Sequence, residues 1–440
     1  EIDLSSVKLK YSGLSPWEIW LSEAQERMVM AVSPANLPRL QEICDTYSVE
    51  LTDIGAFNTS GRLLVRFAQK VILNLDNQFL HEGIPQRKLT AVIPPPAQSP
   101  AKTAEAPAGV NFNNTLLKLL AHPNIASKEA IIRIYDHEIQ GATVVKPLTG
   151  AQNDGPSDAC VLKPADSIDC CGIALSNGIN TEYGKLDAYG MAVAVIDEAV
   201  RNVVAVGANP DKIAILDNFC WGDPTRPETM GSLLEAARGC YDGALRYKTP
   251  FVSGKDSFNN EYLGSDGLRH AIPPTLLISA LGLLDDIRYC ISMDAKTAGN
   301  LLYLVGEMNP AFGGSHFNLV AADQAVQDYI PQPSLKAPQV YKRFYQAVRQ
   351  RLVRACHDLS EGGLAVAAAE MGMAGRLGIE LDIPAGDAAR FVFGETNGCL
   401  LVEIEPRVQP QFEKLFEALP VLKIGRVTAQ PVLNITRQGK

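Results

Sequence analysis

The chain has 440 residues, of which 46% are hydrophobic and 20% are charged, and its formal net charge is −9 at pH 7. This length is enough for about three domains, each able to bury its own core. The acidic balance argues against a nucleic-acid partner, because such a partner needs concentrated Lys and Arg. Nine scattered cysteines without a C-x-x-C pair indicate the reducing cytoplasm, and no apolar run reaches the roughly 18 residues of a membrane span.

The first predicted elements recur near the end of the chain. Residues 21–32 read LSEAQERMVMAV and residues 393–404 read FGETNGCLLVEI, and each is a Glu motif followed by a β-favouring run. A strand is predicted before each motif, and a helix and an Ile-Gly turn after each, which indicates two copies of one unit. Because a long stretch precedes only the second copy, we expect the chain to open in the middle of a domain.

A linker and a separate α/β region are predicted between the copies. The Pro- and Ala-rich stretch AVIPPPAQSPAKTAEAPAG at 91–109 indicates an extended linker. Strands are then predicted at TVVKPL, ACVLKP and KIAILDNF, with helices over about 188–206 and 228–247. The first of these helices is expected to stop at Gly207, because glycine is favoured just after helix ends.

Two polar groups of this region point to a cation. Asp158 follows the loop TGAQNDGPS at the start of a predicted strand. An aspartate there either binds a ligand or simply stabilises a turn. Glu198 and Asn202 are four residues apart, so they share one helix face and both oxygens can face the same ion. Magnesium prefers such oxygen ligands, and a solvated helix face is the alternative.

Two further groups point to a phosphate ligand. Asp217 is predicted at the end of an apolar strand, where open α/β sheets place ligand groups, although it could cap a turn instead. The stretch FVSGKDSFNNEY at 251–262 is predicted to leave another strand end. There Gly254 permits close backbone approach, Lys255 suits phosphate and Ser257 can donate to a substrate oxygen, with a plain hairpin turn as the alternative.

The repeated unit adds two more stretches. In CHDLSEGGLAVAAAEM a helix is predicted to begin at a Gly-Gly pair, which places Asp358, Ser360 and Glu361 near the positive end of its dipole. Phosphate and magnesium suit such a position, and an ordinary N-cap is the alternative. Glu23-Ala24-Gln25 heads a predicted strand and offers a carboxylate beside an amide. No Walker-type P-loop occurs in the sequence.

Together these motifs resemble one family. LSEAQERM, YDHEIQGATVVKP, LDNFCWGDPTRPE, VSGKDSFNNE and HDLSEGGLAVAAAE are similar, in order and over essentially the whole chain, to the synthetase component of phosphoribosylformylglycinamidine synthase. This family belongs to the aminoimidazole ribonucleotide synthetase superfamily, so the resemblance implies an α/β fold built from N-terminal-type and C-terminal-type domains. The implied organisation is a partial C-terminal-type domain at 1–85, a linker at 86–115, an N-terminal-type domain at 116–290 and a C-terminal-type domain at 291–440.

The resemblance also implies an activity in purine biosynthesis. ATP would phosphorylate the amide oxygen of formylglycinamide ribonucleotide, and ammonia would then displace phosphate to give the amidine. Ammonia would come from a separate glutaminase subunit, with a small accessory subunit completing the complex. The family's catalytic histidine lies in the N-terminal portion of the synthetase, so no catalytic residue is assigned here and the chain alone is expected to be inactive.

The family's binding residues transfer to matching positions of this chain. The resemblance places Asp217, Gly254 and Lys255 near the catalytic ATP, although many members have an asparagine where Lys255 stands, so that phosphate contact is expected there rather than metal binding. The implied substrate-binding residues are Glu23, Ala24, Gln25 and Ser257. A second, structural nucleotide site with ADP and magnesium is implied at Ser157, Asp158, Glu198, Asn202, Asp358 and Ser360.

Two other interpretations compete with this one. The first is another enzyme of the superfamily, such as aminoimidazole ribonucleotide synthetase, thiamine-monophosphate kinase or selenophosphate synthetase. Those enzymes have one unit, whereas a second copy here carries SEAQERM. The second is a non-catalytic scaffold that holds a nucleotide and docks other subunits.

Overall fold

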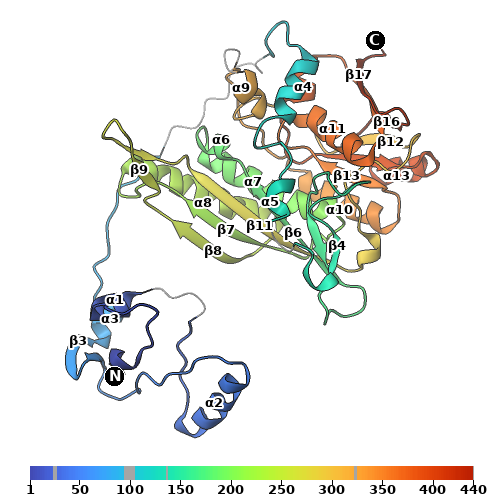
Figure 1. The fold of residues 1–440 in the computed structure, drawn as a ribbon. Coiled ribbons are helices and arrows are strands. Elements are labelled where there is room, and N and C mark those ends of the chain that lie inside the picture. Colours follow the sequence, from blue (N-terminus) through green and yellow to red (C-terminus); the bar gives the residue numbers. More distant parts are fainter. Residues whose placement is uncertain (23–26, 94–104, 135–136, 322–324, 440) are drawn as a thin grey trace. The chain divides into compact units, whose positions relative to one another are not determined.

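The computed structural model describes residues 1–22, 27–93, 105–134, 137–321 and 325–439 (Figure 1). Two compact units make up the chain, an N-terminal unit of Glu1–Lys88 and a main unit of Leu89–Lys440. Within the described ranges, no helix combines the length and the apolar character that crossing a bilayer requires.

The N-terminal unit is a three-stranded sheet with short helices around a small apolar core. Its elements are β1 (Ile2–Asp3), α1 (Pro16–Leu21), α2 (Leu37–Thr46), β2 (Arg62–Phe67), β3 (Lys70–Asp76) and α3 (Asn77–Glu82). The sheet order is β1-β2-β3, and Leu4, Ile19 and Val65 are buried beneath it.

The main unit holds two six-stranded sheets. Sheet A and its helices comprise α4 (Phe112–Leu120), α5 (Glu129–Ile132), β4 (Thr143–Val145), β5 (Cys160–Leu162), β6 (Gly172–Ile179), α6 (Thr181–Gly184), α7 (Ala188–Ala205), β7 (Ile213–Cys220), α8 (Pro227–Tyr247), β8 (Phe251–Ser257) and β11 (Thr275–Leu284), with the hairpin β9 (Glu261–Leu263) and β10 (Arg269–Ala271) beside them. Sheet B and its helices comprise β12 (Leu301–Val305), α9 (His316–Ala321), α10 (Ala337–Arg349), β13 (Ala355–Asp358), α11 (Gly363–Gly375), β14 (Gly378–Ile383), α12 (Ala388–Phe393), β15 (Leu400–Ile404), α13 (Gln409–Leu415), β16 (Val421–Thr428) and β17 (Leu433–Arg437).

The two copies of the predicted repeat share their backbone pairing. In the N-terminal unit β1 pairs in parallel with β2, and Ile2 forms an antiparallel bridge to Gly55. In sheet B β14 pairs in parallel with β17 and antiparallel with β16, where Leu381 lies opposite Gly425. The predicted Ile-Gly turns are wrong, because Gly55 forms an isolated bridge and Gly425 lies inside β16. The two glycines share a close approach instead, since a side chain at either would overlap a backbone carbonyl of the facing segment.

One predicted strand of the first copy is absent. Residues 27–32 have no regular structure, and the Met28 and Val29 side chains are 85% and 83% exposed. Their counterpart in the second copy, β15, is a central strand paired with both β12 and β13. The described part of the N-terminal unit contains no equivalent of those two partners, and a β-favouring run without a ladder on either side does not become a strand.

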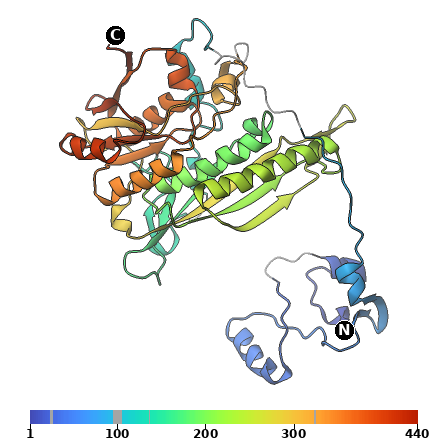
Figure 2. The ribbon, with the colours of Figure 1, turned by 180° about the vertical axis from the view of Figure 1, so that it is seen from behind.

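Sheet A has helices on one face. Its order is β4-β5-β6-β11-β7-β8, antiparallel except for the edge pair β7 and β8. The burial of β11 alternates along the strand, as expected for a sheet with one covered face. Helices α7 and α8 lie side by side on that covered face (Figure 2). The predicted helices at 188–206 and 228–247 are thus confirmed within a residue at each end.

Helix α7 lies between the two sheets. Sixteen of its 18 residues are buried, so it is a core helix covered on all sides rather than a surface helix. Asp187 caps its start by accepting a hydrogen bond from the Gly190 amide at 2.9 Å. Gly207, with φ of 105°, follows its last turn, which confirms the predicted helix stop.

Sheet B has the order β13-β15-β12-β16-β14-β17; it is buried on both faces along β13, β15 and β12, whereas β16 and β17 are partly exposed. Leu302, Leu304 and Leu401 pack in one apolar cluster with α11 and α12. The opposite face, including Tyr303 and Val402, belongs to a larger cluster that also contains the buried residues of α7. The two sheets therefore share a continuous core, which fixes the ends of β5, α7 and β13 relative to one another.

Candidate functional site

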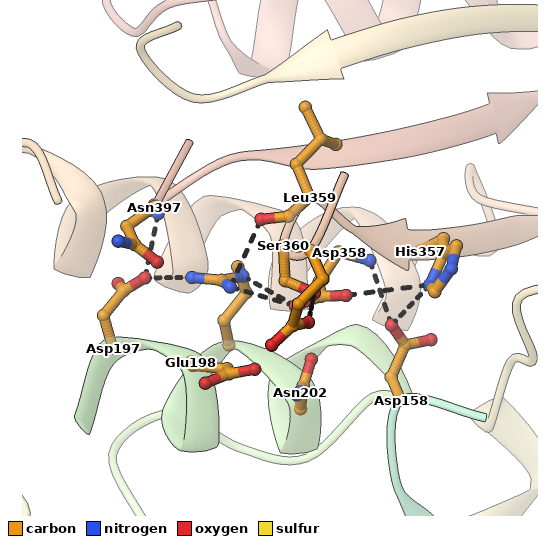
Figure 3. Close-up of polar contacts among 12 residues, drawn as sticks. Asp158, Asp197, Glu198, Asn202, His357, Asp358, Leu359, Ser360 and Asn397 are labelled. Atoms are coloured by element: carbon orange, nitrogen blue, oxygen red, sulfur yellow. Dashed lines mark hydrogen bonds and ion pairs between the residues drawn. The ribbon is translucent and has the colours of Figure 1, made fainter. Parts of the chain in front are cut away.

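A cavity of about 620 Å³ lies in the main unit and is lined by residues of both the sheet A half and the sheet B half. Its lining combines apolar side chains with a group of acids and amides. All six residues predicted for a second nucleotide site line it: Ser157, Asp158, Glu198, Asn202, Asp358 and Ser360. Several of them are shown with their neighbours in Figure 3. Its volume lies in the usual range for small-molecule sites.

Asp158 has one occupied and one free carboxylate oxygen. Its Oδ1 accepts hydrogen bonds from His357 Nδ1 at 2.8 Å and from the Asp358 backbone amide at 2.9 Å. Its Oδ2 is buried and has no hydrogen-bond partner. A buried carboxylate oxygen without a donor is costly, so this geometry favours a cation at that position.

Glu198 and Asn202 project from the same face of α7, as the four-residue spacing predicts. Glu198 Oε2 accepts from the Ile179 amide at 2.9 Å, and Asn202 Nδ2 donates to the Asn177 carbonyl at 3.4 Å. The Asn202 Oδ1 atom is buried without a partner. Burial, together with the neighbouring Glu361 charge, raises the pKa of Glu198 well above its usual value. A nearby cation would relieve that cost.

Asp358 is held by a buried arginine that sequence reasoning missed. Asp358 Oδ2 accepts from Arg201 Nη2 at 2.9 Å and from Nε at 3.2 Å. Arg201 also pairs with Asp197 one turn earlier on α7, and both side chains are fully buried. Asp197 in turn accepts from the Tyr341 hydroxyl at 2.6 Å and the Gly398 amide at 2.8 Å. The network ties α7 to the sheet B half.

His357 is a second residue that sequence reasoning missed. Its Nε2 lies 2.9 Å from Glu370 Oε2, while its Nδ1 faces Asp158. Burial by itself lowers the pKa of His357, but the Asp158 and Glu370 carboxylates outweigh it and raise that pKa well above its usual value. The only sequence signal is its place directly before Asp358 in CHDLSEGG. Asp158 is 199 residues away along the chain and Glu370 is 13 residues away, so neither contact is visible in the local pattern.

The start of α11 lies beside these acids. Gly362 and Gly363 both have positive φ, at 76° and 69°, and a side chain at Gly363 would lie 2.5 Å from the Gly394 carbonyl oxygen. Ser360 Oγ donates to Glu361 Oε2 at 2.8 Å. Residues with side chains strain such a backbone, so the Gly-Gly pair permits the tight turn from which α11 starts. A helix start of this kind favours anions.

The predicted catalytic ATP residues lie elsewhere, on sheet A. Asp217 is opposite Gly254 in the parallel pair of β7 and β8, and a side chain at Gly254 would lie 2.6 Å from the Asp217 carboxylate. Lys255 Nζ donates to Ser257 Oγ at the exposed edge of the sheet. None of these four residues, all of them described, lines the cavity.

The expectation that these residues stand at strand ends is wrong. Strand β7 continues to Cys220, and β8 runs through Ser257. Asp217 faces Ile278 of β11 on its other side. Because β7 is hydrogen-bonded to both β11 and β8, the strand continues beyond its polar residues. Cross-strand pairing overrides the local preference of Asp and Gly for turns.

The predicted substrate segment Glu23-Ala24-Gln25 lies outside the described residues. Its counterpart in the second copy begins at Glu395, which is 1% exposed. Glu395 Oε1 accepts from the His316 amide at 2.7 Å and the Gly362 amide at 3.1 Å, and Oε2 accepts from the Tyr183 hydroxyl at 2.8 Å. In the second copy this glutamate is therefore an internal anchor with its acceptors occupied.

The contact between His316 and Glu395 makes stability depend on pH. Burial lowers the pKa of His316, but the hydrogen bond and charge of Glu395, at 3.0 Å from Nδ1, more than offset it and raise that pKa. Glu361 and Glu182 add to the increase. Because the folded value lies above the unfolded value of about 6.5, the contribution is complete below that pH and is lost as pH rises through the folded pKa.

We therefore expect His316→Gln to lower the free energy of unfolding by about 1.5–3 kcal/mol at pH 6 and by less at pH 9. Urea unfolding of both proteins at the two pH values measures the difference. Replacing His270, which is partly exposed and pairs with Asp266 in a hairpin, is the control and should change stability little at either pH. An effect of His316→Gln that is the same at both pH values would contradict the assignment.

Comparisons with known proteins agree with the predicted fold and family. The C-terminal domain of AIR synthase related proteins matches residues 1–67 and 297–438, and the N-terminal domain matches residues 156–284. The first match includes both copies of the repeat. The predicted class, an α/β synthetase-type unit preceded by part of another C-terminal-type domain, is confirmed in its fold.

Relatives match nearly the whole chain. The phosphoribosylformylglycinamidine synthase subunit PurL of Methanocaldococcus jannaschii is 33% identical over 99% of this chain and 59% of its own length. The PurL subunit of Leuconostoc mesenteroides is 32% identical over 99% of this chain and 56% of its own length. The chain thus spans little more than half the length of these curated relatives.

The fold is also similar to solved structures. PurLQS from Thermotoga maritima aligns with 97% of this chain and 59% of its own chain, with a TM-score of 0.63 and 19% identity. The chain belongs to the AIR synthase related proteins, and over nearly its whole length it is a homologue of the PurL subunits of phosphoribosylformylglycinamidine synthase.

Proposed function

We propose that the cavity binds a magnesium nucleotide and that the chain serves the synthetase part of phosphoribosylformylglycinamidine synthase. One observation carries the proposal. Asp158 Oδ2 and Asn202 Oδ1 are buried, have no partner and line the same cavity as Glu198 and Asp358. Oxygen ligands from carboxylates and an amide suit magnesium, which usually shares its coordination with phosphate.

The remaining lining fits a nucleotide. The start of α11, beside Ser360, suits phosphate through its helix dipole, since the Gly362 and Gly363 amides already donate to Glu395 and to the Ser360 carbonyl. Apolar side chains of the cavity offer a surface for a base: Leu120, Ile125, Ile132, Leu148, Val366 and Met373. Bound magnesium would neutralise phosphate charge, while the residues of this chain orient the nucleotide and exclude water.

The family supports the reaction. Thermotoga maritima PurL has been solved in complexes named for ATP, ADP and FGAR. In the proposed reaction the amide oxygen of formylglycinamide ribonucleotide attacks the γ-phosphorus of ATP and ADP leaves. Ammonia then adds to the amide carbon, the carbon–oxygen bond to phosphate breaks and the nitrogen loses a proton. Phosphorylation is needed because an amide oxygen is a poor leaving group.

Residue roles for this reaction follow the family motifs. Asp217, Gly254 and Lys255 are proposed to bind the reacting ATP, and Ser257 with Glu23, Ala24 and Gln25 the substrate. We propose a C-terminal-type domain portion at 1–85, a linker at 86–115, and N-terminal-type and C-terminal-type domains at 116–290 and 291–440. A glutaminase subunit and a small accessory subunit are the proposed partners, consistent with the PurLQS assembly of the relative.

The nucleotide of the cavity is proposed to be structural. The residues that line the cavity and the proposed ATP residues on β7 and β8 form separate groups, so a nucleotide in the cavity does not face the proposed substrate residue Ser257. This separation also supports the alternative of a nucleotide-binding scaffold. Incubation with radiolabelled ATP distinguishes a structural nucleotide from a reacting one. A structural nucleotide stays bound and raises the Tm of the protein without being hydrolysed.

Asp158→Asn tests magnesium binding with little change of shape. The amide keeps one oxygen for His357 and Asp358 and replaces only the free Oδ2 with an NH2 group, which cannot bind a cation. Loss of a residue that merely orients a ligand costs about 10–100-fold in metal affinity, so loss of a direct ligand is expected to cost about 100-fold. Isothermal titration with ADP and magnesium, and with ADP and EDTA, measures it.

Asp382→Asn is the matched control. Asp382 Oδ1 accepts from the Thr436 hydroxyl at 3.1 Å and the Gly439 amide at 2.9 Å, at a sheet edge outside the cavity lining. This variant should bind magnesium ADP as the wild type does. If Asp158→Asn also binds it unchanged, magnesium is not held at this position and the proposal fails.

A further inference from the structure

The two innermost carboxylates of the cavity each have one oxygen tied to a buried cationic side chain. Asp358 Oδ2 is held by Arg201, and Asp158 Oδ1 is held by His357 at 2.8 Å. The Asp358 amide also donates to Asp158 Oδ1, which leaves Oδ2 as the one oxygen of that carboxylate without a donor. The orientation of Asp158, and hence of its free oxygen, is set by donors that all come from β13.

His357 is itself fixed from behind. Its side chain is 9% exposed, and its Nε2 contacts Glu370 Oε2 at 2.9 Å, on the second turn of α11. Both ring nitrogens lie within hydrogen-bond distance of carboxylate oxygens, so both are occupied in this arrangement. Although Asp158, His357 and Asp358 stand close enough to surround an ion, the ring therefore acts here as a hydrogen-bond partner of Asp158.

We propose that His357, held by Glu370, is a positioning residue that turns the free oxygen of Asp158 toward the cation of the cavity. The proposal rests on the proposed function, because the cation is the one that accompanies the nucleotide. The contact between His357 and Asp158 joins the two halves of the main unit. Asp158 precedes β5 of sheet A, whereas His357 belongs to β13 and its support Glu370 to α11. The residue thus couples the assembly of the two halves to the geometry of the site.

The chemistry of the two amide side chains provides a sharp test. An asparagine at position 357 places its NH2 group near the Nδ1 position of the ring and can still donate to Asp158. A glutamine places its NH2 group near the Nε2 position, where it meets Glu370 and leaves Asp158 without this donor. A merely structural histidine would not distinguish the two replacements in this order, because the larger glutamine fills the space better.

Binding of Mn2+ alone to the whole chain, counted by the EPR signal of free Mn2+, is the primary measurement. We expect His357→Asn to bind within about 3-fold of the wild type, and His357→Gln and His357→Phe to bind about 10–100-fold more weakly. His316→Phe is the matched control. His316 is also a buried histidine paired with a buried carboxylate, but it does not contact Asp158, and its loss should leave Mn2+ affinity unchanged.

Each outcome decides between the two claims. If the wild type binds Mn2+ and His357→Gln binds it equally, or if Asn and Gln are equally weak, the positioning role is wrong while the proposed function stands. If the wild type binds neither Mn2+ nor magnesium ADP, the proposed function fails and this inference fails with it. Should the position 357 variants unfold, Glu370→Met removes the support of the ring from α11, and unchanged Mn2+ affinity in that variant would overturn the proposal.

Discussion

Replacing Arg201 with methionine is expected to lower the free energy of unfolding of the main unit by about 3–5 kcal/mol. Arg201 is fully buried and its guanidinium contacts both Asp197 and Asp358. Removing it leaves Asp197 without a cation and Asp358 with only His357, at 3.8 Å, and the Tyr341 hydroxyl and Gly398 amide cannot replace the lost charge. Chemical denaturation followed by circular dichroism measures the change.

An exposed arginine on the neighbouring helix provides the control. Arg238 pairs with Glu235 on α8 and its side chain is 62% exposed, so Arg238→Met should cost about 0.5 kcal/mol or less. A loss below about 1 kcal/mol in Arg201→Met would show that the buried network is not the link between α7 and sheet B. The Arg201–Asp197 and Arg238–Glu235 pairs have similar helical spacing. The larger loss of stability expected for Arg201→Met therefore depends on burial.

Gly178→Ala is expected to disturb the fold and the cavity together. Gly178 of β6 packs directly against α7, and a side chain there would overlap the Val195 carbonyl oxygen and lie 2.9 Å from the Ala199 amide. Both atoms belong to helix backbone and cannot move aside alone. Such overpacking typically costs about 1–3 kcal/mol. Because α7 carries Glu198 and Asn202, we also expect weaker binding of magnesium ADP.

The comparison variant is Leu175→Ala, on the same strand but on the opposite, partly exposed face. It should change stability by less than Gly178→Ala and leave nucleotide affinity unaltered. Thermal unfolding with and without magnesium ADP reports both effects in each variant. If Gly178→Ala is destabilised but binds the nucleotide normally, the position of α7 does not control the site.

Much of the fold followed from patterns that lie close together along the chain. The apolar run of α7, ended by Gly207, defines that helix without any knowledge of its surroundings. The repeated Ile-Gly pair is equally local and marked both copies, although neither pair forms the predicted turn. The run at 27–32 shows the limit, because whether it becomes a strand depends on neighbouring strands rather than on its own residues. For the same reason Asp217 lies inside a strand.

The acids that line the cavity were predicted from the sequence, whereas the side chains that hold those acids in place were missed. Asp158, Glu198 and Asp358 stand next to turns or share a helix face, which are features readable from sequence. Arg201 carries one local signal, its four-residue spacing from Asp197 on α7. Its contact with Asp358 spans 157 residues and that of His357 with Asp158 spans 199, so neither is readable from a local pattern. Only the packing of α7 and β5 against β13 brings these side chains together.

The most direct test of the central claim is a crystal structure of the chain with Mn2+ and ADP, with the ion located by its anomalous scattering. The account predicts an anomalous peak bonded to Asp158 Oδ2 and to phosphate oxygens, with the phosphates at the start of α11. A nucleotide ordered against Asp217 and Lys255 on β7 and β8, with no manganese in the cavity, would contradict it.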